Sequence, residues 1–179
     1  MNVVIDGDSV AKLRPDNWPA LFADRYHVKV TCLASDEAKT PVVMDRLPKA
    51  FAASPDLYIL QLGQWSYHNE ERAAFFSGMS HIISAVHDKG VPVVLCTPTH
   101  MAPPEHPDKW TVEVIHDLSM RYNTGLVDFY HRMLDAGADE SWFLPQDLGT
   151  KWVCHLNARG SREAVTYFDR IIQPYEVSL

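Results

Sequence analysis

Ser9 and His155, near opposite ends of the chain, are of the residue types that form a nucleophile and its base. Ser9 ends the tripeptide Gly7-Asp8-Ser9, shortly after the apolar run Val3-Val4-Ile5, and His155 lies in the segment 154–160. A serine hydroxyl attacks poorly near neutral pH until a base within hydrogen-bond reach takes its proton. The pair predicts nucleophilic catalysis if the fold brings the two together. Alternatively, Ser9 is an ordinary helix N-cap and His155 only bonds to a loop.

The elements that must position this pair alternate between short apolar runs and helical patterns. The apolar runs, rich in Val, Ile and Leu without polar alternation, are typical of strands buried on both faces. They are Asn2 to Ile5, His27 to Leu33, Leu57 to Leu62, Val91 to Cys96 and Gly125 to Val127. Helices are predicted at Trp18 to Tyr26, Pro41 to Phe51, Glu70 to Lys89, Trp110 to Tyr122, Phe129 to Ala136 and Asn157 to Gln173.

Alternating strands and helices predict a parallel, doubly wound sheet in a three-layer α/β/α sandwich. Ligand sites in such folds lie at the carboxyl ends of the strands. Ser9 is predicted where the first strand turns into a helix, whose amides can receive developing negative charge. Three long connections, Gly63 to Asn69, Thr97 to Lys109 and Gly137 to Val153, emerge at the same edge. Long connections in a compact domain are typical of functional loops.

Aromatic residues in these connections predict a pocket that accepts acyl chains or sugar rings. The residues expected to bind substrate are Trp65, Tyr67, His68 and Trp142. The alternative is that some of these side chains only cover the ends of the sheet.

Composition limits the class of protein. The 179 residues, 46% hydrophobic, predict a single domain over 1–179, and a net charge of -7 without Lys/Arg clusters argues against nucleic acid as a partner. No apolar run is long enough to span a bilayer, and no leader pattern opens the chain. We therefore expect a cytoplasmic protein, or a secreted one only if a leader peptide was removed. The oligomeric state is not predictable from these features.

The histidines do not predict a metal site from their spacing. None of the pairs among His100, His106, His116 and His131 shows the i, i+4 spacing with a glutamate that marks a zinc-binding helix. We therefore expect no metal, and the chemistry of a serine nucleophile needs no cofactor. Cys154 beside His155 could be a rival nucleophile. Adjacent side chains on an extended segment point to opposite faces, so Cys154 is expected to pack inward.

Nearly the whole chain resembles, in order, the SGNH or GDSL hydrolases, which include esterases, lipases, thioesterases and carbohydrate acetylesterases. Ile5-Asp6-Gly7-Asp8-Ser9 is similar to the first block of the family and 155–160 to its fifth block. The resemblance implies five parallel strands in the order 2-1-3-4-5. It also implies that Ser9 is the nucleophile, that its backbone amide binds the oxyanion, and that His155 acts as base and then as acid.

Two middle blocks depart from the family pattern. The glycine of the second block is absent from 33–37, where the backbone amide of Ser35 or Asp36 could serve instead. In the third block Gly63 is followed by Gln64-Trp65-Ser66 in place of the usual Asn and Asp. The side-chain amide of Gln64 or Asn69 is a plausible replacement oxyanion donor. The Gly-Gln-Trp sequence is similar to Gly-His-Trp in the branch of polysaccharide acetylesterases and acetyltransferases, which points to an O-acetyl sugar.

The fifth block also departs from the pattern, because Trp152 stands three residues before His155 where the family has aspartate. A histidine base needs an acceptor that holds the right tautomer. The backbone carbonyl of Trp152 is the preferred acceptor, because its position follows from local spacing. Asp147 is the alternative, and Asp139 and Glu140 are more distant options.

The sequence thus predicts a serine esterase or acylhydrolase that cleaves a short acyl or O-acetyl ester, with carbohydrate esters among the candidate substrates, through an acyl-enzyme on Ser9. The substrate is then a small-molecule or glycan ester. Two alternatives remain open. One is an acyltransferase to a sugar hydroxyl on the same fold, and the other is a binding module of the same fold without catalytic activity.

Overall fold

A computed structural model describes residues 1–99, 109–147 and 153–176 of the chain. Within these ranges five parallel strands form one sheet in the order β2-β1-β3-β4-β5, which confirms the predicted architecture and strand order. The strands are β1 (Asn2–Gly7), β2 (Lys29–Cys32), β3 (Leu57–Gln61), β4 (Val93–Cys96) and β5 (Gly125–Val127).

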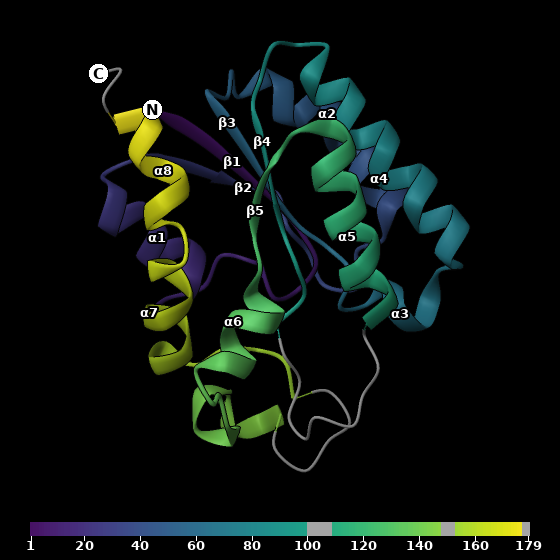
Figure 1. The fold of residues 1–179 in the computed structure, drawn as a ribbon. Coiled ribbons are helices and arrows are strands. Elements are labelled where there is room, and N and C mark those ends of the chain that lie inside the picture. The colour runs from purple at the N-terminus through teal and green to yellow at the C-terminus, as the bar shows by residue number, and fades with distance from the viewer. Residues whose placement is uncertain (100–108, 148–152, 177–179) are drawn as a thin grey trace.

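Helices cover both faces of the sheet (Figure 1). One layer contains α1 (Trp18–Tyr26), α7 (Ala158–Thr166) and α8 (Asp169–Glu176), and the other contains α2 (Thr40–Ala52), α4 (Arg72–His87) and α5 (Lys109–Tyr122). Side chains alternate along β1, so Val3 and Ile5 join the core beneath the first layer while Val4 joins the core beneath the second. Burial on both faces explains why the strands lack polar alternation.

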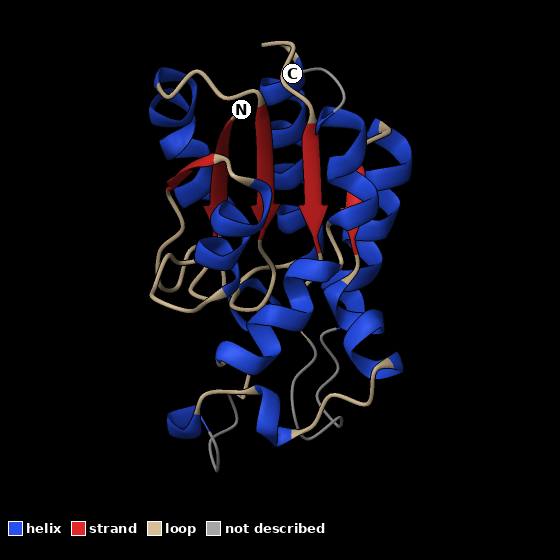
Figure 2. Cartoon of the chain, turned by 90° about the vertical axis from the view of Figure 1, so that its left-hand side faces the viewer, coloured by secondary structure: helices blue, strands red, loops and turns tan. Residues whose placement is uncertain are grey.

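The carboxyl ends of all five strands face the same side of the molecule, where the long connections gather (Figure 2). Three short helical elements lie in these connections, namely α3 (Ser66–Asn69) and the 3-10 helices η1 (Glu140–Trp142) and η2 (Pro145–Asp147), while α6 (Phe129–Asp135) follows β5 at the same edge. A membrane-spanning helix is not found among the described residues, because none of their helices is both long and apolar enough.

Two predicted elements differ in the structure. The final helical stretch is two helices, and the break places Phe168 in the core, where its ring stacks on Trp18 at 5.5 Å between centroids. Ser9 also does not begin a helix. It lies in a turn closed by hydrogen bonds from the amides of Ala11 and Lys12 to the carbonyls of Asp8 and Ser9, and α1 begins only at Trp18. The predicted contribution of a helix N-terminus at Ser9 is therefore wrong.

The end of β1 can only be built with glycine. Gly7 has a φ of +146°, and a Cβ at this position would lie 1.8 Å from the carbonyl oxygen of Gln61 on β3. The absence of a side chain lets β1 and β3 stay paired up to the residue before the turn. This close approach brings the chain directly into the Asp8-Ser9 turn.

Candidate active site

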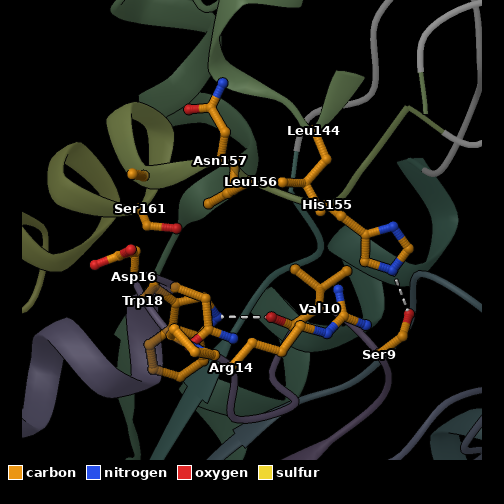
Figure 3. A pocket seen from close by; sticks show the side chains of 13 residues that line it. Ser9, Val10, Arg14, Asp16, Trp18, Leu144, His155, Leu156, Asn157 and Ser161 are labelled. Atoms are coloured by element: carbon orange, nitrogen blue, oxygen red, sulfur yellow. Dashed lines mark hydrogen bonds between the residues drawn. The ribbon is translucent and has the colours of Figure 1, made fainter. Parts of the chain in front are cut away.

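Ser9 and His155 meet at the carboxyl edge of the sheet. The hydroxyl oxygen of Ser9, in the turn after β1, lies 2.8 Å from Nε2 of His155, in the segment before α7 (Figure 3). Both side chains are partly exposed, so a substrate can reach them. This distance allows the imidazole to take the hydroxyl proton as an ester carbonyl is attacked.

The other ring nitrogen of His155 contacts Asp147. Nδ1 lies 2.9 Å from Oδ2 of Asp147, and the backbone amide of His155 donates to the same oxygen at 2.9 Å. The loop path that brings Asp147 here is held by hydrogen bonds from the amide of Leu144 to the carbonyl of His155 and from the amide of Asp147 to the carbonyl of Leu144. A carboxylate in this position stabilises the tautomer that leaves Nε2 able to accept a proton.

Among the proposed acceptors that the structure describes, Asp147 is the one in contact with the His155 ring. Trp152, whose carbonyl was the preferred acceptor, lies outside the described residues. Asp139 instead accepts hydrogen bonds from the amide and the hydroxyl of Ser141, and Glu140 is exposed in η1.

Asp8 fastens the Ser9 turn to the loop after β3. Its carboxylate is buried, and it accepts hydrogen bonds from the amide of Val10 at 3.2 Å and from the amide of Gln64 at 3.1 Å. Burial raises the pKa of Asp8 to about 6, and these amide hydrogen bonds oppose the rise. The position of Gln64 relative to Ser9 thus depends on a carboxylate in the same turn.

A second buried carboxylate, Asp6, supports the turn from beneath. Arg46 of α2 pairs with it at 3.1 Å, and the hydroxyl of Tyr58 donates to it at 3.1 Å. Burial raises the pKa of Asp6, while Arg46 acts in the opposite direction. The same guanidinium donates to the carbonyls of Gly7 and Leu33, so it ties β1 to the loop after β2.

Gln64 is buried and oriented by the loop after β4. Its Oε1 lies 3.2 Å from the hydroxyl of Thr99, which also lies 2.9 Å from the carbonyl oxygen of Cys154. Thr99 therefore joins the loops after β3 and β4 to the segment that carries His155. The side-chain oxygen of Gln64 faces Thr99, and the amide nitrogen is the half of this side chain that can donate to an oxyanion.

Two cavities flank the pair formed by Ser9 and His155. The first, of about 270 Å³, is here named the Gln64 cavity, and it is lined by Ser9, Arg14, Asp36, Glu37, Gln64, Trp65, Cys154 and His155. The second, of about 240 Å³, is named the Ser161 cavity (Figure 3). Its lining includes Ser9 and His155 together with Arg14, Asp16, Asn157 and Ser161. An ester bound at Ser9 could place its acyl group on one side and its alcohol on the other.

The two backbone amides predicted from the second block, those of Ser35 and Asp36, have different surroundings. The amide of Ser35 donates to the carbonyl of Gly7 at 3.2 Å, so it is already committed to the backbone. Asp36 lines the Gln64 cavity, which keeps its amide as a predicted oxyanion donor. The Asp36 side chain pairs with Lys12 at 2.6 Å, and this contact holds the pKa of its carboxyl below the ordinary value.

Several other predicted residues are not brought to the described cavities. Asn69 donates its side-chain amide to the carbonyl of Trp65 within α3, and the ring of Tyr67 packs beside those of His68 and Trp110. Trp142 is only 7% exposed and lies in the core, against Gly160 of α7. Trp65 is the one predicted aromatic residue that lines a cavity at this site among the described residues.

Cys154 is buried, as expected, and packs against Val10. Its sulfur lies 3.9 Å from Nδ1 of His155, on the opposite side of the ring from the nitrogen that contacts Ser9. The geometry therefore favours Ser9 over Cys154 as the group activated by Nε2.

The sequence reasoning did not identify Arg14, Asp16 or Ser161. Arg14 lines both cavities, and the Ser161 hydroxyl, although buried, has no hydrogen-bond partner among the described residues. Figure 3 shows this hydroxyl directed toward the cavity and the amide of Asn157 directed away from it. No local pattern marks these residues, because only the fold brings 14–16 beside the first turn of α7.

Comparison with known proteins decides the family. The sequence model of the GDSL-like lipase/acylhydrolase family matches residues 6–163, a range that contains Ser9, Asp147 and His155. The chain belongs to this family. It is accordingly an ester-hydrolysing enzyme of the GDSL type. A search of curated proteins found no match.

Solved structures of GDSL hydrolases share the fold at low sequence identity. The acetyl xylan esterase AlAXEase superposes with a TM-score of 0.79 at 18% identity, covering 96% of this chain and 100% of that one. A lipase/acylhydrolase from Enterococcus faecalis gives 0.79 at 19% identity, with coverage of 97% and 96%. A catalytic mutant of the acetylxylan esterase Axe2 from Geobacillus stearothermophilus gives 0.77 at 13% identity, with coverage of 96% and 93%.

If Gln64 donates to the oxyanion as predicted, its replacement with alanine should lower kcat of this GDSL hydrolase by ~10²–10³-fold with little change in KM. Steady-state kinetics on an aryl acetate measure the change. Asn69→Ala is the matched control, since that amide bonds within α3, and it should stay within about twofold of the wild type. Equal losses in the two variants would contradict the assignment of Gln64.

Proposed function

We propose that this chain is a serine esterase that cleaves short acyl or O-acetyl esters of a hydroxylated alcohol, with Ser9 as nucleophile, His155 as base and Asp147 as its orienting carboxylate. The single observation that carries the proposal is the continuous contact from Ser9 Oγ to His155 Nε2 at 2.8 Å and from His155 Nδ1 to Asp147 at 2.9 Å. Ser9 and His155 line both cavities, so a bound ester can reach them.

In the first half-reaction the Ser9 oxygen bonds to the ester carbonyl carbon while Nε2 of His155 takes the hydroxyl proton. The carbonyl oxygen becomes an oxyanion, and in this proposal the Gln64 side chain and the backbone amides of Ser9 and Asp36 donate hydrogen bonds to it. When the intermediate collapses, the bond to the alcohol oxygen breaks, and the proton on Nε2 passes to that oxygen. The alcohol leaves, and the acyl group stays on Ser9.

In the second half-reaction a water molecule attacks the acyl-enzyme. Nε2 of His155 accepts a proton from the water, and the second tetrahedral intermediate expels the Ser9 oxygen, which takes that proton back. The carboxylic acid leaves, and the contact between Ser9 and His155 is restored. Asp147 keeps its charge throughout and stabilises the imidazolium that forms in each half.

The sizes of the cavities support a small acyl group. A volume of about 270 Å³ in the Gln64 cavity lies below the range of pockets that hold drug-sized ligands. The Ser161 cavity supports a hydroxylated alcohol, because Arg14 supplies donors, Asp16 supplies acceptors and the buried Ser161 hydroxyl lies at its wall. The acetyl xylan esterases that share the fold act on a substrate of this kind.

An acyltransferase to a sugar hydroxyl is the second candidate, favoured by the same polar cavity, which could hold an acceptor sugar in place of water. The test measures both the free acid and the alcohol released from an acetylated methyl xyloside, an aryl acetate and the matching aryl octanoate, with and without added free xyloside. We expect acetate release from both acetyl esters without an acceptor and a slower release of octanoate from the aryl octanoate. Turnover that appears only with the acceptor would replace hydrolysis by transfer, and no turnover would favour a binding module.

A further inference from the structure

Three side chains with metal-binding atoms converge at the β5 end of the carboxyl edge, outside the cavities at Ser9. His116 comes from α5, Asp128 directly follows β5, and His131 lies in the first turn of α6. Oδ2 of Asp128 lies 2.8 Å from Nε2 of His116 and 2.7 Å from Nδ1 of His131, and the three atoms all lie within 4.8 Å of one another. The sequence spacing did not reveal this group because the residues come from three elements.

Hydrogen bonds fix one oxygen of the Asp128 carboxylate, Oδ1, while the other, Oδ2, lies beside the two histidines. Oδ1 accepts hydrogen bonds from the hydroxyl of Thr97 and from the backbone amide of His131, each at 3.1 Å. Thr97 is in turn fixed, because its hydroxyl oxygen accepts the amide of Tyr130 at 3.0 Å. Metal-binding carboxylates typically have outer hydrogen bonds of this kind, which orient the ligating oxygen.

His116 supplies the observation that an ordinary helix cap does not explain. Asp128 caps α6, and this role accounts for its contacts with His131. Nε2 of His116, however, is buried and not aligned for a hydrogen bond to the carboxylate despite the short distance, and it has no hydrogen-bond partner among the described residues. Nε2 thus lies at ion-pair distance from the carboxylate without a hydrogen bond, in a side chain that is 36% exposed, and an ion between the two atoms would satisfy both.

We propose that His116, Asp128 and His131 bind one divalent transition-metal ion of the zinc class. Two imidazole nitrogens and one carboxylate oxygen suit zinc, cobalt, nickel and copper, and a water molecule completes a tetrahedral site. Ligand atoms in such a site lie about 3.3 Å apart, so the contacts with Asp128 need to lengthen by only about half an ångström.

The ion has a route from solvent and a structural role. A cavity lined by His116, Tyr130 and His131 opens beside the cluster, and it also contains the acidic residues Glu113 and Asp117. The bound ion would join α5 to α6 at the edge strand of the sheet. The proposal is independent of the esterase mechanism, because no ligand of the ion contacts Ser9 or His155 in the described structure.

Isothermal titration of the full chain with zinc chloride tests the site, with the cobalt absorption spectrum as a second readout. We expect 1:1 binding, loss of that binding in His116→Gln and His131→Gln, and ~10–100-fold weaker binding in Thr97→Val, which removes an outer hydrogen bond. Asp128→Asn can still cap α6 but provides a poor ligand, so it should also weaken zinc binding. Circular dichroism checks that each variant folds. His81→Gln, an exposed histidine of α4, is the matched control and should bind as the wild type does.

A second candidate metal site lies beside Ser9, because ligand atoms of Asp147, Cys154 and His155 also lie within 4.8 Å of one another. Titration of His155→Gln separates the two sites, and we expect it to keep the 1:1 binding. The proposal is overturned if the wild type binds no zinc. It is equally overturned if binding survives in both His116→Gln and His131→Gln, or disappears in His155→Gln alone.

Discussion

Replacing His155 with glutamine should lower kcat for acetate release by ~10⁵–10⁶-fold, a loss as large as removal of the nucleophile itself. The substitution removes the imidazole nitrogen that lies 2.8 Å from the Ser9 hydroxyl, and without a base the hydroxyl is too weak a nucleophile at neutral pH. Initial rates on an aryl acetate measure the effect. Residual activity arises only from oxyanion and substrate binding.

The control for this variant is His81→Gln, since His81 is exposed on α4 and far in sequence from the site. Its kcat should equal that of the wild type. A His155→Gln protein that folds normally and retains more than a hundredth of the wild-type rate would show that another group activates the nucleophile.

Replacing Asp147 with asparagine should lower kcat by about 10⁴-fold while KM changes little. The asparagine side chain can present its amide hydrogen to Nδ1 of His155, which favours the tautomer that carries its proton on Nε2. That tautomer cannot accept the Ser9 proton, although the shape of the site is preserved. Steady-state kinetics separate this loss in kcat from a loss of binding.

Asp139→Asn is the matched control, because Asp139 caps η1 through Ser141 and asparagine also caps well. We expect it to stay within a few-fold of the wild type. If Asp147→Asn kept nearly full activity, a Ser-His dyad oriented by another acceptor, such as the carbonyl of Trp152, would account for the site better.

The parallel sheet was predictable from local signals, whereas the strand order and the roles of Ser9 and His155 came from the family resemblance. Each strand is a short apolar run without polar alternation, and the parallel sheet then brings the ends of β1 and of the segment before α7 to one edge. Gln64 was named from the third block of the family resemblance, and the loop after β3, the neighbour of β1, brings it to a cavity beside Ser9.

The other features depend on paths that local patterns do not determine. Asp147 reaches His155 only because Leu144 hydrogen-bonds back to that residue, and nothing in 137–153 indicates this route. Trp142 was expected to bind substrate, but the loop that carries it folds onto Gly160, where the ring is covered. The contact of His116 with Asp128 joins residues 12 positions apart on different elements, so no motif spacing describes it.

Labelling with a fluorophosphonate tests the central claim, that Ser9 is a nucleophile activated by His155, most directly. The intact mass of the wild-type protein should rise by one adduct at neutral pH, and peptide mapping should place it on Ser9. Ser9→Ala should take up no label, whereas Ser80→Ala, which removes the hydroxyl of a serine on α4, should be labelled like the wild type. Equal labelling of Ser9→Ala, or an unlabelled wild type, would contradict the account.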